Sequence, residues 1–159
     1  EEDARSARSI ARSIVSSRPI QSTKELTEAV TAAIGKRSAA RIHPATKVFM
    51  SLRITVNAEL QALELALPQA LGLLKPGGRL VVVSYQSLED RIVKQFIRRE
   101  STQCICPPRQ IVCTCEHQMQ IRRLSRGVTT PSLDEISRNP ASRSAKLRAA
   151  ERLAADTRV

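Results

Sequence analysis

The chain has 159 residues, of which 42% are hydrophobic, so it is long and apolar enough for one domain with a core, or one and a half. Lysine and arginine number 26 against 15 acidic residues, and the net charge of +11 favours a polyanionic partner, with nucleic acid as the first candidate. The sequence has no long apolar run and no signal-peptide pattern. It therefore argues against membrane insertion and export and for a cytoplasmic location.

The first residues are predicted to form a helix with a basic stripe. Apolar residues recur at helical spacing from Ala4 to Val15, while Arg5, Arg8 and Arg12 lie on another face. Such a stripe is either a solvated charged face or a surface for a polyanion. Both interpretations stay open for this helix alone.

Two further helical segments are predicted by capping and periodicity. Ser22 and Glu25 form a capping box that begins a short helix, and Gly35 ends it. A strongly apolar helical pattern then runs over residues 46–74. Because Pro68 lies inside this run, we expect a kink or two consecutive helices, with Pro68 near the start of the second.

A turn and a strand follow this helical region. Pro76 cannot continue a helix, and Gly77-Gly78 can adopt the positive φ of a tight turn. Residues 80–83 form a continuous β-branched and apolar run, which is typical of a strand covered on both faces of a parallel sheet. The chain begins at Glu1 without an initiator methionine and offers no comparable strand upstream. We therefore expect a C-terminal portion of a longer protein, with the rest of the sheet preceding Glu1.

Polar residues mark the carboxyl end of this strand, where open α/β sheets bind ligands. Ser87 and Asp90 have the spacing of a capping box and predict the start of the next helix. The candidate pocket residues at this end are Ser84, Tyr85, Gln86 and Ser87.

All four cysteines lie in a C-x-C-x6-C-x-C pattern, at Cys104, Cys106, Cys113 and Cys115. Thiolates this close can bind zinc tetrahedrally, and a reducing compartment favours metal ligands or free thiols over disulfides. The C-x-C spacing differs from the usual C-x2-C zinc knuckle. Free thiols and a redox pair therefore stay as alternatives to zinc.

The last third is predicted to hold three short elements. Residues 118–126 suit an edge strand and a basic loop, and a short helix begins after Pro131. Residues 139–148 lead into a predicted final basic helix or tail that ends at Arg152.

Three groups of residues together resemble one family: 42–47 with 52–60, 75–94, and 139–148. They are similar to the MraW/RsmH family, S-adenosylmethionine-dependent methyltransferases that modify the N4 amine of a cytosine in small-subunit ribosomal RNA. The resemblance implies an α/β fold: part of a class I (Rossmann-like) methyltransferase with an inserted all-helical domain, mostly helical in this chain. Residues 1–57 would belong to the inserted substrate-recognition domain and residues 58–159 to the C-terminal half of the methyltransferase domain.

The resemblance also implies partners. The substrate would be the 16S rRNA of the small ribosomal subunit, with no membrane partner, and a homodimer stays open. The cofactor-binding loop would precede Glu1, so this chain should contain no residues that bind S-adenosylmethionine and should be inactive alone. Basic residues of the first part would contact RNA phosphates: Arg5, Arg8, Arg12, Lys36, Arg37, Arg41, Lys47 and Arg53.

One position departs from the family pattern. The family usually has Ser-Phe-His-Ser where this chain has Ser84-Tyr85-Gln86-Ser87. Glutamine keeps hydrogen-bonding capacity but has no titratable imidazole. We favour a positioning role for this residue, which glutamine can fill, over a role as general base.

Two other functions are compatible with the residues. A non-catalytic basic RNA-binding module, stabilised by zinc, would explain the charge and the cysteines without a cofactor. An interaction domain whose charge serves only solubility is the third, and a steep salt dependence of RNA affinity would argue against it.

Overall fold

The computed structural model describes residues 2–35, 43–107, 110 and 112–154. The chain forms two compact units, Glu1–Glu59 and Leu60–Val159. The functional roles that the resemblance gives to the two parts of the chain stay predictions. Among the helices of the described residues, none is both long and apolar enough to span a membrane.

The described residues of the first unit form three helices, and local capping signals fix the ends of the second. The hydroxyl of Ser22 accepts a hydrogen bond from the backbone N–H of Glu25 at 3.2 Å, and Gly35 ends the second helix at φ 69°. The hydroxyl of Ser13 donates to the carbonyl of Ala29 at 2.7 Å, which ties the first two helices together. The predicted cap and stop are confirmed. The helices are α1 (Glu2–Ser16), α2 (Thr23–Ile34) and α3 (Pro44–Val56).

The long apolar run is two helices, but the break is not where Pro68 predicted it. The chain breaks at Asn57 and Ala58, and Ala58 adopts a left-handed φ of 49°. Pro68 lies inside α4 (Glu59–Leu73). The β-branched residues 54–56 lose side-chain freedom in a helix, and asparagine favours helix ends, so the weaker helical sequence lies before Asn57.

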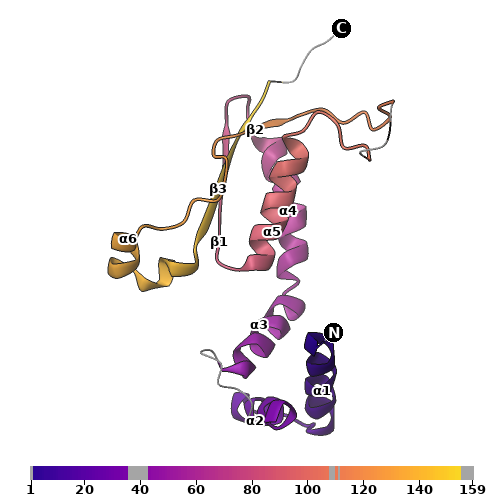
Figure 1. Cartoon of the computed structure of the whole chain (residues 1–159), viewed down its shortest axis with the longest axis vertical. Helices are drawn as coiled ribbons and strands as arrows, with labels where there is room; N and C mark the ends of the chain where they lie inside the picture. Colours follow the sequence, from indigo (N-terminus) through magenta and orange to yellow (C-terminus); the bar gives the residue numbers. More distant parts are fainter. Residues whose placement is uncertain (1, 36–42, 108–109, 111, 155–159) are drawn as a thin grey trace. The chain divides into compact units, whose positions relative to one another are not determined.

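The second unit adds a three-stranded antiparallel sheet, which Figure 1 shows beside α4 and α5. The strand order is β1-β3-β2, so the last strand of the chain is the central one. The prediction of a final helix or tail over residues 139–152 is therefore wrong. Pairing on both sides overrides the helix propensity of this segment. The elements are β1 (Arg79–Ser84), α5 (Ser87–Glu100), β2 (Ile121–Arg123), α6 (Leu133–Arg138), the 3-10 helix η2 (Pro140–Ser144) and β3 (Lys146–Arg152).

Among the residues that the structure describes, only one face of β1 is covered. Leu80 and Val82 pack against the core, whereas Val81 is 53% exposed and Val83 is 49% exposed. β1 also lies at the edge of the sheet formed by the described residues, and its pairing with β3 is antiparallel. The expectation that this strand is covered on both faces is therefore not met within these residues. A parallel partner outside the chain stays a prediction.

The core of the second unit joins both helices to the sheet. Its buried apolar residues come from α4, α5, β2 and β3, and they are Leu67, Leu71, Val93, Ile97, Ile121 and Ala150. Helix α5 contacts all three strands. The core therefore fixes the start of α5 relative to the end of β1.

The predicted turn before β1 is confirmed in detail. Gly77 has φ 80°, and the backbone N–H of Gly78 donates to the carbonyl of Lys75 at 2.8 Å. A side chain at Gly78 would place its Cβ 2.8 Å from that carbonyl oxygen. The residue must therefore lack a Cβ for the helix to turn directly into the strand.

Candidate functional site

The predicted pocket residues lie together where β1 ends and α5 begins. Ser84 is buried, Gln86 is half-buried, and Tyr85 and Ser87 are exposed. Tyr85 is the only tyrosine in the sequence, and it is 57% exposed. This end therefore presents an aromatic side chain and polar groups to an incoming ligand.

The helix cap lies one residue earlier than the sequence predicted. Gln86 is the N-cap, in an extended conformation, and Ser87 is already helical. The carboxylate of Glu89 accepts hydrogen bonds from the backbone N–H groups of Tyr85 at 3.2 Å and Gln86 at 3.1 Å. The predicted pair of Ser87 with Asp90 is wrong, because Asp90 points to another partner.

Gln86 keeps an unused hydrogen-bond acceptor. Its side chain faces the backbone N–H of Glu89 in a capping box, but its buried Oε1 atom makes no hydrogen bond of normal geometry with the residues that the structure describes. A buried amide oxygen without a donor is unfavourable, and native structures rarely retain one without a reason. The residue that departs from the family pattern is thus also the one whose side chain is unsatisfied.

Asp90 links the second and third family segments. Its carboxylate accepts hydrogen bonds from Nε of Arg148 at 2.7 Å and from Nη2 of the same residue at 3.1 Å, and Nζ of Lys146 lies 3.6 Å away. The pairing of β1 with β3 sets Lys146 opposite Ser84. Hydrogen bonds from the Arg148 guanidinium hold the pKa of the Asp90 carboxyl below its usual range.

Sequence reasoning missed this ion pair. The sequence predicts a helix cap at Asp90 and a helix or tail at residues 146–148, and therefore no contact between them. The only signal was the presence of opposite charges in two segments that both carry the family resemblance.

The predicted RNA-contacting residues of the first unit have different environments. Arg8 and Arg12 are exposed on α1, whereas the side chain of Arg5 lies outside the described part of the structure. Lys47 is exposed on α3. Lys36, Arg37 and Arg41 lie outside the described residues.

Arg53 is already bound to an acid. Its guanidinium donates to the two carboxylate oxygens of Glu59 at 2.8 and 3.2 Å, and Nδ2 of Asn57 adds a third hydrogen bond. Hydrogen bonds from Arg53, and then from Asn57, lower the pKa of Glu59. Much of the Arg53 charge is therefore neutralised inside the chain.

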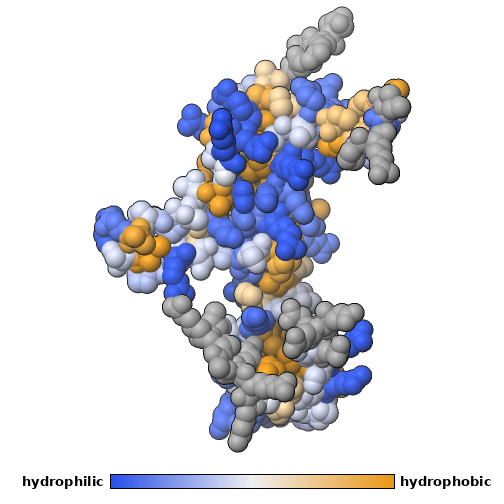
Figure 2. Space-filling model, in the orientation of Figure 1, coloured by the Kyte–Doolittle hydropathy of each residue, from blue (hydrophilic) through white to orange (hydrophobic). Residues whose placement is uncertain are grey.

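A second group of cations surrounds a shallow hollow in the second unit, which we call the basic hollow. Figure 2 shows mainly hydrophilic residues over this part of the molecule, around α5 and β2. Ser125, Gly127 and Ala149 complete the hollow beside Ile97. Its charged residues come from α5, from β2 with the loop after it, and from β3: Lys94, Arg98, Arg123, Arg126 and Arg148. Sequence reasoning singled out none of them, because only the fold brings these segments together.

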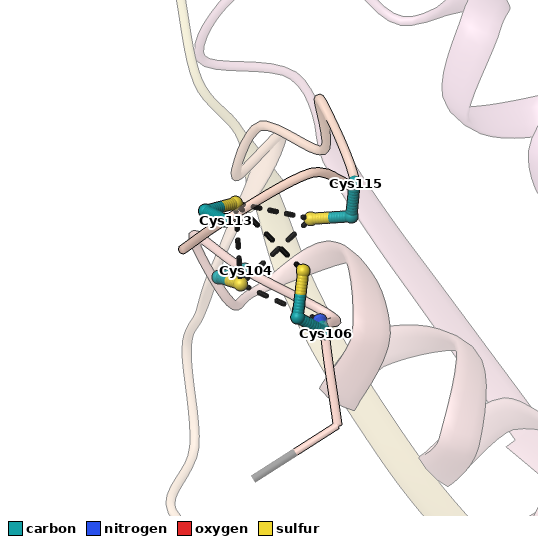
Figure 3. Close-up of side chains that lie close together, drawn as sticks. All are labelled: Cys104, Cys106, Cys113 and Cys115. Atoms are coloured by element: carbon teal, nitrogen blue, oxygen red, sulfur yellow. Dashed lines mark hydrogen bonds between the residues drawn. The ribbon is translucent and has the colours of Figure 1, made fainter. Parts of the chain in front are cut away.

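The four cysteines converge in the segment between α5 and β2 (Figure 3). The Sγ atom of Cys113 lies 3.5 Å from that of Cys104, 3.9 Å from that of Cys106 and 3.6 Å from that of Cys115. The Sγ atoms of Cys115 and Cys104 are 3.7 Å apart. The structure therefore brings together all four residues that the sequence selected as thiol ligands.

Comparison with known proteins gives one consistent family. Residues 2–153 match the family described as MraW methylase family. Proteins named ribosomal RNA small subunit methyltransferase H are similar: that of Dehalococcoides mccartyi is 56% identical over 147 residues (92% of this chain, 42% of the relative). The Thermomicrobium roseum protein is 55% identical over 152 residues (94% and 46%), and the Syntrophotalea carbinolica protein is 50% identical over 153 residues (94% and 49%).

The chain thus spans less than half the length of these curated relatives. The match nevertheless extends over both units and includes the strand end, the Asp90–Arg148 pair and the cysteine segment. The chain belongs to the MraW methylase family.

Proposed function

We propose that a protein containing this chain methylates the N4 amine of a cytosine in 16S rRNA of the small ribosomal subunit, with S-adenosylmethionine as methyl donor. The observation that carries this is the meeting of two family segments at one strand end, where Arg148 binds Asp90 at 2.7 Å, one helical turn beyond Gln86. The names of the relatives support ribosomal RNA methylation.

The residues of this chain are assigned to the target base and not to the cofactor. The sequence has no glycine-rich dinucleotide or phosphate loop that would bind the adenosine and methionine parts of the cofactor. Residues outside the chain would have to supply that site. We therefore expect this chain alone to bind no S-adenosylmethionine and to catalyse no methyl transfer.

The strand end suits an unpaired base with an amino group. A base must leave its stack to be modified, and the exposed ring of Tyr85 offers a surface for stacking it. The N4 amine of cytosine is a poor nucleophile because its lone pair is delocalised into the ring. Acceptors that bind the amine N–H groups and orient the nitrogen lower the barrier by positioning. The Gln86 side chain carries such an acceptor, and its buried Oε1 must turn outward to reach the amine.

A non-catalytic RNA-binding module is the second candidate. The basic hollow and the net charge of +11 favour it, because both would serve RNA binding without chemistry. It gives no role to the unsatisfied Gln86 oxygen at the strand end. The two candidates differ in whether the chain supports methyl transfer.

A chimera separates the candidates. The matching segment of the Thermomicrobium roseum relative would be replaced by this chain, and incorporation of labelled methyl groups from S-adenosylmethionine into small-subunit RNA would be measured. We expect incorporation as N4-methylcytidine, identified by mass spectrometry of digested RNA. A folded chimera that binds RNA and cofactor but transfers no methyl group would contradict the proposal and favour the binding module.

Variants of the chimera test the positioning role. We expect Tyr85→Ala and Gln86→Leu to lower kcat/KM by roughly tenfold or more, and Tyr85→Phe, which keeps the ring, to retain activity. Gln86→His should be active with no new ionisation in its pH–rate profile. A large gain in rate that depends on a group titrating near neutral pH would instead show that the family histidine is a general base.

A further inference from the structure

The cysteine segment has no part in the proposed chemistry, yet its geometry is specific. Four unlinked thiols in a flexible loop have no reason to converge. Here the Sγ atoms of all four cysteines lie within 4.8 Å of one another, and the structure describes them as free thiols. Figure 3 shows the four side chains pointing toward a common centre.

The sulfur separations fit ligands of one tetrahedral ion. A zinc ion bound at about 2.3 Å by four thiolates sets its ligands about 3.8 Å apart along the edges of the tetrahedron. Four of the six separations in this cluster are 3.5, 3.6, 3.7 and 3.9 Å, and all six are within 4.8 Å. We propose that Cys104, Cys106, Cys113 and Cys115 bind a single structural zinc ion.

The same separations disfavour disulfides. A disulfide joins two sulfur atoms at about 2.05 Å and would divide four cysteines into two close pairs. Instead, Sγ of Cys113 has three neighbours at similar distances, namely Cys104, Cys106 and Cys115. This arrangement is that of four ligands around a centre.

The ligands and their spacing restrict the metal to a single thiophilic ion, which metal analysis must identify as zinc. Four soft thiolates exclude magnesium and calcium, which prefer oxygen ligands, and point to zinc or iron. In an iron–sulfur cluster, cysteines bind different irons, so their sulfur atoms spread farther apart than ligands of a single ion. Separations that are all below 4.8 Å therefore favour a mononuclear site.

Backbone groups further support thiolates at this place. The N–H of Cys106 donates to Sγ of Cys104 at 3.4 Å, and the N–H of Ile105 donates to Sγ of Cys115 at 3.5 Å. Such outer hydrogen bonds orient metal ligands and offset their negative charge. The C-x-C spacing thus lets backbone N–H groups at positions 105 and 106 contact two of the four sulfur atoms.

The position of the cluster makes it structural. The segment leaves the C-terminal end of α5 and returns there: the N–H of Gln120 donates to the carbonyl of Glu100 at 2.9 Å, and a ring nitrogen of His117 lies 3.0 Å from the carbonyl oxygen of Arg99. The candidate pocket lies at the other end of α5, a helix of 14 residues and thus about 20 Å long. Four protein ligands also leave no coordination position for a substrate. The ion would hold the two arms of this segment together.

Metal analysis of the reduced chain tests the proposal. The 159-residue chain would be produced with zinc in the medium and purified without chelators, and its zinc and iron contents would be measured by elemental mass spectrometry. We expect one zinc ion per chain and no iron. Cys104→Ser and Cys113→Ser should each abolish stoichiometric zinc, whereas Thr114→Ser, which keeps its hydroxyl between two ligands, should retain it.

Cobalt titration of the unmodified chain keeps the test decisive if a cysteine variant does not fold. Metal-free, reduced protein should develop the visible absorption bands of tetrahedral thiolate-bound cobalt, reach saturation at one ion per chain and lose the bands when zinc is added. Purified chain without stoichiometric zinc and without these bands on titration would overturn the proposal. Bound iron in place of zinc would overturn it as well.

Discussion

Asp90 is the residue that most tightly connects the proposed pocket to the sheet. Its side chain is 12% exposed and that of its partner Arg148 is 15% exposed, so the pair is largely shielded from water. Both oxygens of the carboxylate are bound in a bidentate geometry, which suits the planar guanidinium. Removing one member leaves the other charge without adequate compensation in a poorly solvated place.

We therefore expect Arg148→Met to lower the free energy of unfolding by about 2–3 kcal/mol, below the loss for a fully buried pair because some solvent reaches this one. Arg122→Met is the matched control: Arg122 binds Glu151 at 2.9 Å on the same sheet, but its side chain is 65% exposed. That change should cost less than about 1 kcal/mol. Urea denaturation measures both, and equal losses would contradict the importance given to Asp90.

The pH dependence of stability provides a second test at this residue. Hydrogen bonds from Arg148 lower the pKa of Asp90 in the folded chain, whereas an unfolded aspartate titrates near about 4. The stabilisation is therefore fully present above about pH 4 and is lost as the pH falls through the lower, folded value. Asp90→Asn removes it, so the unfolding free energies of this variant and the unmodified chain should differ most at neutral pH and converge on acidification. A difference that stays constant down to pH about 3 would show that Asp90 does not titrate in this way.

At the scale of elements, the sequence predicts helix ends and turns correctly where residues close in sequence determine the backbone conformation. The cap and the stop of α2 and the turn before β1 are confirmed, because each depends on residues a few positions apart. These are Ser22 with Glu25, Gly35, and the Pro76–Gly78 turn. Strand β3 was not predictable in this way. Its residues are mostly helix formers. Only pairing makes them a strand, with β1 residues 62–72 positions away and β2 residues 27–31 positions away in the sequence.

The same distinction explains the candidate site. Tyr85 and Gln86 were found because they directly follow an apolar run, and the cysteines because they are close in sequence. The Asp90–Arg148 pair and the basic hollow depend on the antiparallel register of β3. No local sequence pattern predicts that register.

The turn before β1 yields a prediction with an internal control. Gly78→Ala would place a Cβ 2.8 Å from the Lys75 carbonyl oxygen, so backbone must shift, and we expect a loss of about 1–3 kcal/mol. Gly72→Ala lies inside α4, where a Cβ meets nothing within 4 Å, and should stabilise the chain by up to about 1 kcal/mol. Thermal unfolding of the two variants measures the contrast. Stabilisation by both changes would show that the turn relaxes freely.

At the scale of the whole molecule, the net charge of +11 is distributed over both units. The cations predicted to bind RNA all lie in the first 53 residues, and one of them, Arg53, is bound to Glu59. The basic hollow adds Lys94, Arg98, Arg123 and Arg126 in the second unit, while its fifth cation, Arg148, is bound to Asp90. If RNA is the substrate, we expect the second unit to contribute phosphate contacts that the sequence did not indicate.

RNA binding by the chain tests this distribution. Affinity for a small-subunit RNA fragment, measured by fluorescence anisotropy over a range of salt concentrations, should fall steeply with salt because bound counterions are released from the phosphates. Lys94→Ala and Arg126→Ala, both in the basic hollow, should each weaken binding and reduce the slope of log affinity against log salt by about 1. Lys24→Ala on α2, a cation 4.0 Å from Glu28 and outside every predicted contact, should leave the slope unchanged. Equal effects of all three changes would mean that RNA responds only to net charge, and the hollow would then lose its place in the substrate-binding surface.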